Sequence, residues 1–270
     1  MWLTRSSRGE AVNAVDVATL LRLPIDVACV LLLFCRVGAV VMLLPAFSDN
    51  AIPPQIRLVM ALAFTFGMYG MLETRVLPAT TSGVSMPLLV MSEVMVGLSL
   101  GMIVRIMFSA AAMAGAIASQ QVGLSSALVF DPAMGGQAPL LSRFVGLGAI
   151  VVCLGLGVHH LWIASIFTSY ASFPTGGLPP AADFAHLAVS VMGQAMALGV
   201  SLCAPLILYG LLFNLGLGLA ARVAPAIQVF FIAQPLNLLL GLSVLAMTIG
   251  AVLTTFARAM ATFMQNGWTY

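Results

Sequence analysis

Few side chains in this 270-residue chain are of the kinds that do chemistry, and two stretches imitate known motifs. The stretch Gly97-Leu98-Ser99-Leu100-Gly101 fits the GxSxG pattern of a nucleophile elbow. That elbow needs a strand-to-helix turn, whereas this stretch lies inside an apolar run. The stretch Gly216-x-Gly218-x-x-Ala221 imitates a dinucleotide fingerprint, but no βαβ pattern or suitably spaced acid accompanies it. We therefore expect neither nucleophilic catalysis nor nucleotide binding.

Histidines and cysteines are too few and too scattered to form a metal site. His159 and His160 end an apolar run, which is typical of an interfacial or packing feature, and His186 stands apart. The cysteines lie inside apolar runs without CxxC spacing, as small buried hydrophobic residues do: Cys29, Cys35, Cys153 and Cys203. The sequence predicts no catalytic, cofactor-binding or metal-binding residues, and no enzyme activity.

Glu93 is the acidic side chain that most needs an explanation, because a carboxylate at membrane depth is costly. Gly97 and Gly101 follow it at intervals of four, so the three residues share one helix face. Small residues let another helix approach closely. We predict that Glu93 faces protein and pairs with a polar group; the alternative is a proton-relay carboxylate of the kind that transporters use.

The composition of the chain indicates whether these residues belong to a soluble protein or to a membrane protein. The chain is 61% apolar and 7% charged, with ten arginines, no lysine and eight acids. A soluble domain carries about 25% charged residues. The net charge of +2 leaves no basic patch for phosphates, which excludes a nucleic-acid partner. The mean hydropathy of +1.12 indicates a membrane protein rather than a soluble enzyme.

Long apolar runs without period-2 alternation predict helices rather than barrel strands. The fold class is therefore all-α: a helical membrane protein of long, broken helices and helical hairpins. The second run has 15 residues, which is marginal for spanning, and Pro205 and Pro235 are expected to interrupt the last two. The six runs are 25–44, 58–72, 88–130, 140–158, 187–213 and 229–253.

We expect a single domain over residues 1–270, because no soluble domain separates the apolar runs. Residues 1–24 form a polar N-terminal segment. The first apolar run is longer than the roughly 7–15 residues of a cleavable signal, so this segment is expected to be retained. Arginines are scattered singly through the loops, which gives no basis for predicting the orientation.

The stretch from Ser109 to Ser126 is unlike a lipid-facing helix. It is rich in Ala, Gly and Ser and carries Gln120-Gln121 in place of bulky Leu and Ile. Irregular backbone at membrane depth is tolerated only inside protein or beside water. Two interpretations stay open: a tightly packed helix, or a mobile segment associated with a pore.

Several short motifs follow one another along the chain in a characteristic order. The motifs are Pro53-Pro54 before Arg57, Glu93-x-x-x-Gly97-x-x-x-Gly101, Ala114-Gly115, Gln121-x-Gly123-Leu124-Ser125, Asp131-Pro132, Gly157-x-His159-His160, Ser169-Tyr170, Pro174-x-Gly176, Arg222-x-x-Pro225, Val229-Phe230, and Pro235 before Gly241. In this order of motifs, from about residue 25 to 260, the chain resembles the FliR family of export-gate components of the flagellar type III secretion system. The related component of virulence injectisomes shares the Glu-x-x-x-Gly-x-x-x-Gly motif, but Asp131-Pro132 with Gln137 and Leu140-Leu141 looks more like the flagellar branch.

The resemblance implies a structural, non-enzymatic protein without cofactors. A single FliR copy assembles with FliP and FliQ into the channel through which unfolded flagellar proteins are secreted. Family members also dock onto FlhB, and the gate works with FlhA. The resemblance places the protein in the bacterial inner membrane, in the flagellar basal body, in contact with membrane lipid. In such an assembly much of the apolar surface faces neighbouring subunits, so hydropathy overstates the number of spans.

The resemblance also implies roles for residues of this chain. A family loop near the Ala-Gly pair contributes to a plug that closes the channel, and here it corresponds to Met113, Ala114, Gly115, Ala116, Ile117, Ala118, Ser119, Gln120 and Gln121. Helix packing and buried polar pairing are expected at Glu93, Gly97, Gly101, Arg222 and Pro225. The chain departs from the family pattern at Ala116, Ala226 and Gln228.

Two rival functions follow from other features of the sequence. Runs interrupted at Pro205 and Pro235 are compatible with a small-solute secondary transporter, since broken helices often mark binding sites at the midplane. No inverted repeat and no cluster of convergent polar groups supports that hypothesis. An intramembrane hydrolase lacks both a nucleophile and a metal signature.

Overall fold

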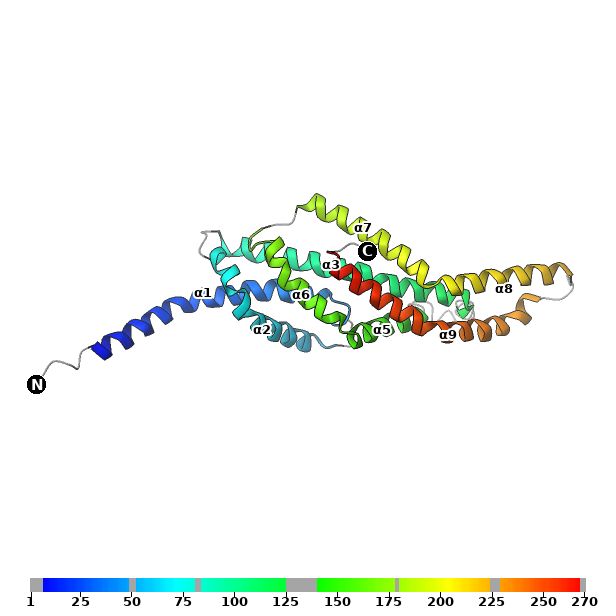
Figure 1. Ribbon diagram of the computed structural model, residues 1–270, viewed down its shortest axis with the longest axis horizontal. Coiled ribbons are helices and arrows are strands. Elements are labelled where there is room, and N and C mark those ends of the chain that lie inside the picture. Colours follow the sequence, from blue (N-terminus) through cyan, green and yellow to red (C-terminus); the bar gives the residue numbers. More distant parts are fainter. Residues whose placement is uncertain are drawn as a thin grey trace, which may run out of the picture. The chain divides into compact units, whose positions relative to one another are not determined.

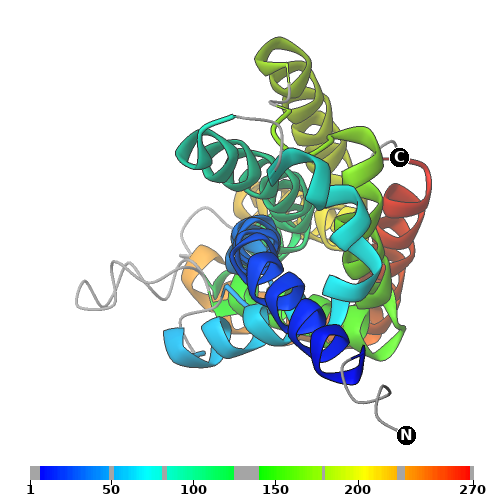
Figure 2. The same ribbon diagram turned by 90° about the vertical axis from the view of Figure 1, so that its left-hand side faces the viewer.

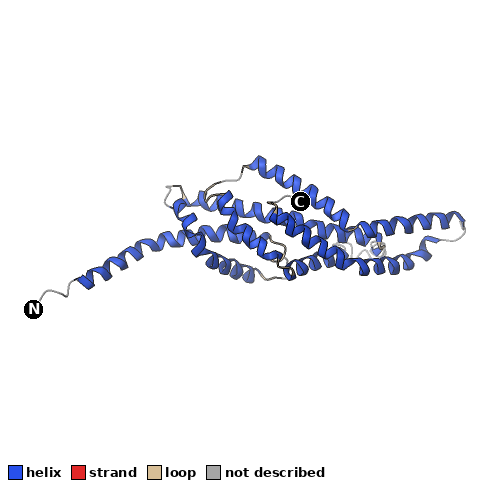
Figure 3. Cartoon of the chain, viewed as in Figure 1, coloured by secondary structure: helices blue, strands red, loops and turns tan. Residues whose placement is uncertain are grey.

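The computed structural model describes residues 7–48, 52–80, 84–124, 140–177, 180–223 and 229–267, without the side chains of 7–24 and 229–231. All the secondary-structure elements in these ranges are helices (Figure 3). The all-α prediction is confirmed. The helices, labelled in Figure 1, are α1 (Ser7–Leu43), α2 (Pro54–Thr80), α3 (Met86–Gln121), α5 (Leu140–Gly155), α6 (Val158–Ser172), α7 (Ala181–Leu202), α8 (Ala204–Val223) and α9 (Val229–Gln265).

Within the described ranges, six helical segments are long and apolar enough to cross a membrane, and α5 and α6 together meet the same criterion as a bent pair. The chain is therefore a helical membrane protein. The expectation that the second run is marginal is wrong, because α2 extends over 27 residues. Pro54 begins this helix, at a position where the missing N–H of proline has no intrahelical partner to lose.

The helix expected to run to Val158 is broken earlier. α5 ends at Gly155, and α6 continues at an angle of 77°. Gly157 lies between them with φ +75°, in the left-handed region that glycine enters without steric cost. Its N–H donates to the carbonyl of Leu154, which closes the end of α5. His159 and His160 therefore lie in the first turn of α6 and do not end a span.

The two prolines predicted to interrupt helices have different outcomes. The break near Pro205 is confirmed, since α7 ends at Leu202 and α8 begins at Ala204. The interruption predicted at Pro235 is wrong, because α9 continues through it to Gln265. Pro235 lies near the start of α9 and deprives one carbonyl of its intrahelical donor, a loss that packed membrane helices tolerate.

The described helices belong to two compact units. Unit 1 comprises residues 1–102 and 165–184, and unit 2 comprises residues 103–164 and 185–270. The single domain expected over 1–270 stays a prediction. In unit 1, α1 and α2 lie side by side (Figures 1 and 2). The buried residues of α2 recur every three or four positions, as on one helix face: Ala61, Thr65, Met68, Leu72 and Val76.

The core of unit 2 is built around an aromatic cluster. Phe108 on α3 makes edge-to-face contacts with Trp162 on α6 and Phe256 on α9, at centroid distances of 5.7 and 5.0 Å. Such pairs contribute about 0.5–1.5 kcal/mol beyond their area burial. Within this unit α9 also packs against α5 and α8. The second half of α3 is thereby held among helices of unit 2.

Candidate functional site

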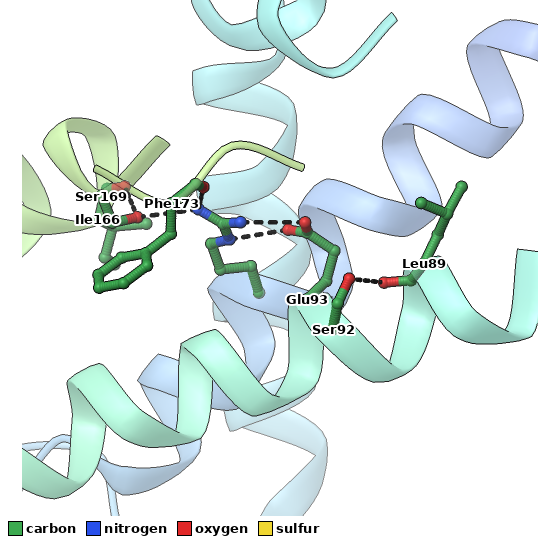
Figure 4. A network of polar contacts seen from close by, with 7 residues as sticks. Leu89, Ser92, Glu93, Ile166, Ser169 and Phe173 are labelled. Carbon is green, nitrogen blue, oxygen red and sulfur yellow. Dashed lines mark hydrogen bonds and ion pairs between the residues drawn. The ribbon is translucent and has the colours of Figure 1, made fainter. Parts of the chain in front are cut away.

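Arg36 on α1 and Glu93 on α3 form an ion pair in the core of unit 1, and both side chains are 0% exposed. Nε of Arg36 donates to Oε2 of Glu93 at 2.7 Å, and Nη2 donates to Oε1 at 3.0 Å. Two parallel hydrogen bonds of this kind match the planar fork of the guanidinium to the carboxylate. Figure 4 shows the pair and its neighbours.

The guanidinium of Arg36 also contacts the end of α6. Nη1 donates to Oγ of Ser169 at 3.3 Å and to the carbonyl oxygen of Phe173 at 3.0 Å (Figure 4). Its Cζ lies 3.8 Å from the centroid of the Tyr170 ring, a cation–π contact. One buried side chain thus ties α1, α3 and the segment after α6 together within unit 1.

Two glycines bring the backbones of α1 and α3 close beside this pair. A Cβ atom at Gly97 would lie 2.6 Å from the carbonyl oxygen of Arg36, and one at Gly101 would lie 2.7 Å from Cβ of Leu43. Side chains larger than hydrogen therefore do not fit there unless the helices separate. Glu93, Gly97 and Gly101 all face α1, which is the arrangement that small-xxx-small spacing favours.

Forming the buried pair adds little net stability, whereas removing one of its partners is costly. Removing two charges from solvent costs several kcal/mol per ion, which the mutual attraction offsets only when the geometry is good and the remaining protons are bonded. Arg36 meets this condition through Ser169 and Phe173. Removing one partner leaves an uncompensated buried charge, so the pair fixes the register of α1 and α3 more than it adds net stability.

The stretch Met113–Gln121 forms the last turns of α3 and not a loop, so the expectation of a loop there is wrong. Its small residues lie against other helices of unit 2. A Cβ at Gly115 would lie 2.6 Å from the carbonyl oxygen of Leu141. Oγ of Ser142 donates to the carbonyl of Ala112 at 2.7 Å. As far as Gln121 the stretch that begins at Ser109 is a packed helix, and its association with a pore stays a prediction.

The end of α3 is held by polar contacts from α8 and α9. Nδ2 of Asn237 donates to the carbonyl of Gln121 at 3.4 Å, and the hydroxyl of Tyr209 donates to Oδ1 of Asn237 at 2.8 Å. A Cβ at Gly241 would lie 2.9 Å from Cα of Val122. The predicted plug stretch is thus anchored at its C-terminal end between the two helices.

Comparison with known proteins identifies the family. The bacterial export proteins of family 1 match residues 27–263 of the chain. The flagellar biosynthetic protein FliR of Caulobacter vibrioides (strain ATCC 19089 / CIP 103742 / CB 15) is 39% identical over 223 residues, which cover 82% of this chain and 88% of that protein. This chain belongs to family 1 of the bacterial export proteins.

More distant relatives of this export protein carry the same description. FliR of Escherichia coli (strain K12) is 32% identical over 78% of the chain and 80% of its own length. FliR of Bacillus subtilis (strain 168) is 28% identical over 77% of the chain and 81% of its own length. The resemblance to the FliR family is confirmed.

The remaining predicted residues of the export protein belong to the C-terminal part of the chain. Arg222 is exposed in the last turn of α8, where a cation interacts favourably with the helix dipole. Pro225, Ala226 and Gln228 lie outside the described residues. Within the described ranges no three His, Cys, Asp or Glu side chains are grouped to hold a metal ion.

Sequence reasoning singled out Glu93 but did not pair it with Arg36. A signal was present, because each is a charge inside an apolar run and the two signs are opposite. Ser169 and Tyr170 appeared only as a motif, and the structure gives that motif a physical role as the lining of Arg36. Cys203 is also more than a small hydrophobe, because its thiol donates to the carbonyl of Ala114 at 3.3 Å.

Breaking the ion pair from one side should destabilise unit 1. We expect Arg36→Met and Glu93→Leu each to lower the free energy of unfolding by about 3–5 kcal/mol, because each leaves one buried charge alone. The double variant should regain most of the loss, since both charges are gone. SDS titration of the purified protein in detergent, followed by circular dichroism, measures the three values. Losses that simply add in the double variant would show that the two residues do not act as a unit.

A glycine-to-alanine substitution should push α1 and α3 apart only at a position where their backbones are in contact. We expect Gly97→Ala to lower the melting temperature in detergent, because its Cβ would overlap the backbone of Arg36. Gly67 on α2 is the matched control, since a Cβ there meets no atom within 4 Å. Alanine is the better helix former, so Gly67→Ala should leave the melting temperature unchanged or raise it. Equal effects of the two substitutions would contradict the close approach.

Proposed function

We propose that this membrane protein is a structural subunit of the flagellar type III protein export gate, located in the bacterial inner membrane at the flagellar basal body. In this proposal it forms with FliP and FliQ the channel through which unfolded flagellar proteins leave the cell, and it works with FlhB and FlhA. The observation that carries the proposal is the family match over residues 27–263, together with relatives described as flagellar biosynthetic protein FliR.

The buried pair favours a structural role over proton transport. A relay carboxylate must exchange its proton with water or a neighbouring carrier. Both oxygens of Glu93 are instead occupied by Arg36, and the side chain is 0% exposed. Glu93 is therefore suited to holding helices in register, which is what a fixed part of a protein channel requires. This weakens the rival hypothesis of a secondary transporter.

The C-terminal turns of α3 are the part of the chain best suited to a seal. Their small residues allow close packing on the backbone of α5, as Gly115 does on Leu141. Hydrogen bonds from Ser142 and Asn237 hold this stretch at both ends. In the proposed mechanism an entering polypeptide displaces Met113–Gln121 from its neighbours, so the channel opens by separating packed surfaces rather than by chemistry.

The flagellar assignment is preferred to the corresponding subunit of a virulence injectisome. The printed names of the relatives at 39% and 32% identity are flagellar.

Deletion of the gene tests the proposal. We expect the deletion strain to lose filament assembly, motility and secretion of hook and filament proteins, because no other subunit would complete the channel. Uptake of small solutes should be unchanged. Immunoblots of culture supernatants and swimming assays measure these outcomes. A deletion strain that still secretes hook and filament proteins would overturn the proposed function.

A substitution in the last turns of α3 tests the seal. We expect Gly115→Val to change export or to cause ion leakage, because its side chain would force α3 away from the backbone of α5. Gly146 on α5 is the control, since a Cβ there meets no atom within 4 Å. Secretion assays and membrane-potential dyes in the complemented deletion strain give the readout. If Gly115→Val and Gly146→Val both behave as the unsubstituted protein, this stretch is not the seal.

A further inference from the structure

Three polar residues join the end of α3 to α8 and α9 within unit 2 and are here named the α3 clasp: Gln121, Tyr209 and Asn237. Asn237 on α9 is 9% exposed. Its Nδ2 donates to the carbonyl of Gln121 at 3.4 Å, and its Oδ1 accepts from the hydroxyl of Tyr209 on α8 at 2.8 Å. The same hydroxyl lies 3.0 Å from the backbone carbonyl oxygen of Asn237. One amide thus connects all three helices.

The clasp satisfies a backbone group that α3 leaves open. The last four carbonyls of an α-helix have no donor in a following turn. The carbonyl of Gln121, the last residue of α3, receives its donor from Asn237. A buried primary amide needs an acceptor for its N–H and a donor for its oxygen, and the Tyr209 hydroxyl supplies that donor. The hydroxyl thereby fixes which end of the Asn237 amide faces α3.

Glycines make room for the clasp. A Cβ at Gly123, just after α3, would lie 2.8 Å from Nδ2 of Asn237. The φ of Gly123 is +83°, in the left-handed region that glycine enters without steric cost. A Cβ at Gly210 on α8 would overlap Oε1 of Gln121. The end of α3 fits against α8 and α9 because no side chain occupies these two positions.

The clasp is also suited to being released. Its amide–carbonyl distance of 3.4 Å exceeds the roughly 2.7–3.2 Å of an ordinary N–H···O bond. Farther back on α3, the hydroxyl of Ser142 reaches the carbonyl of Ala112 at 2.7 Å, and Gly115 places backbone against α5. Helix ends also fray before their interiors. A force on Met113–Gln121 should therefore separate its C-terminal end first.

We propose that Asn237 is a positioning residue of the seal: oriented by Tyr209, it holds the end of α3 in the closed channel, and an entering polypeptide opens the channel by separating the end of α3 from α8 and α9. The inference rests on the proposed function, since it takes Met113–Gln121 to be the seal. In the alternative, Asn237 is a buried amide that stabilises the fold and stays bonded during export.

A disulfide across the clasp tests whether the clasp opens. With Gln121→Cys and Gly210→Cys the two Cβ atoms would lie 3.3 Å apart, close to the roughly 3.5–4.5 Å of a disulfide. The substitution also removes the glutamine oxygen that a Cβ at Gly210 would overlap. A membrane-permeable oxidant closes the disulfide in the complemented deletion strain, and dithiothreitol reopens it. We expect closure to lower secretion of hook and filament proteins at least about fivefold, and reduction to restore it.

Each single-cysteine variant is the control for the oxidant, and its secretion should be the same with and without it. Labelling of the thiols with maleimide–polyethylene glycol gives the fraction of chains that are cross-linked. Full secretion by cross-linked chains would overturn the proposal, because the clasp would then stay closed during export. Thiols that do not cross-link would contradict the contact between Gln121 and Gly210.

Substitutions in the clasp test its effect on the closed channel. We expect Asn237→Leu to raise the ion leak at least about threefold, since the last carbonyl of α3 loses its donor. Tyr209→Phe should raise the leak less and should add nothing to Asn237→Leu, because the hydroxyl acts through the amide. Ser243→Ala is the control, since this exposed hydroxyl bonds the carbonyl of Leu239 within α9. Membrane-potential dyes measure the leak at equal recovery of FliP and FliQ with the tagged chain.

An unchanged leak with Asn237→Leu at equal recovery of the assembly would overturn the proposal. If Asn237→Leu lowers that recovery, Tyr209→Phe decides, because its ring keeps the packing; a leak no higher than that of Ser243→Ala would then overturn the proposal. If the deletion strain still secretes hook and filament proteins, the proposed function fails. If it does not but the cross-linked chain secretes fully, only the present inference fails.

Discussion

A buried guanidinium and a buried carboxylate each need an oppositely charged bonding partner. In unit 1 this requirement sets the register of α1 against α3. Arg36 and Glu93 meet only when the two helices are aligned to within a fraction of a turn. Gly97 then lets the backbones touch one turn farther along. The interaction also reaches the carbonyl of Phe173, so the segment after α6 is placed by the same cation.

Close approach at glycine recurs along α3, and it explains why one helix carries so many small residues. In unit 1 the glycines face α1, and in unit 2 Gly115 faces α5. Each contact is held by a polar interaction nearby, the ion pair in the first case and the hydroxyl of Ser142 in the second. Within each unit, α3 therefore has a close backbone contact that a polar interaction supports.

The sequence was sufficient for the fold class and the family, because long apolar runs and ordered motifs do not depend on tertiary contacts. It was insufficient where tertiary contacts determine where a helix ends or which side chains pair. The helix break after Gly155 coincides with the left-handed glycine Gly157, and α9 continues through Pro235, which the sequence predicted to interrupt it. The partner of Glu93 lies 57 residues away in the chain, and no periodicity reveals such a pairing. The composition of Ser109–Ser126 marked that stretch as unlike a lipid-facing helix but did not distinguish a packed helix from a mobile, pore-associated segment.

An experimental structure of the export gate, purified through a tag on this chain, tests the central claim most directly. The claim is that the Arg36–Glu93 pair fixes α3 against α1 of the same chain, and that the C-terminal turns of α3 close the channel. The account predicts Glu93 bonded to Arg36 of the same chain, with helical Met113–Gln121 beside the channel axis. A carboxylate of Glu93 bonded to another subunit, or a closed channel from which this stretch is remote, would contradict it.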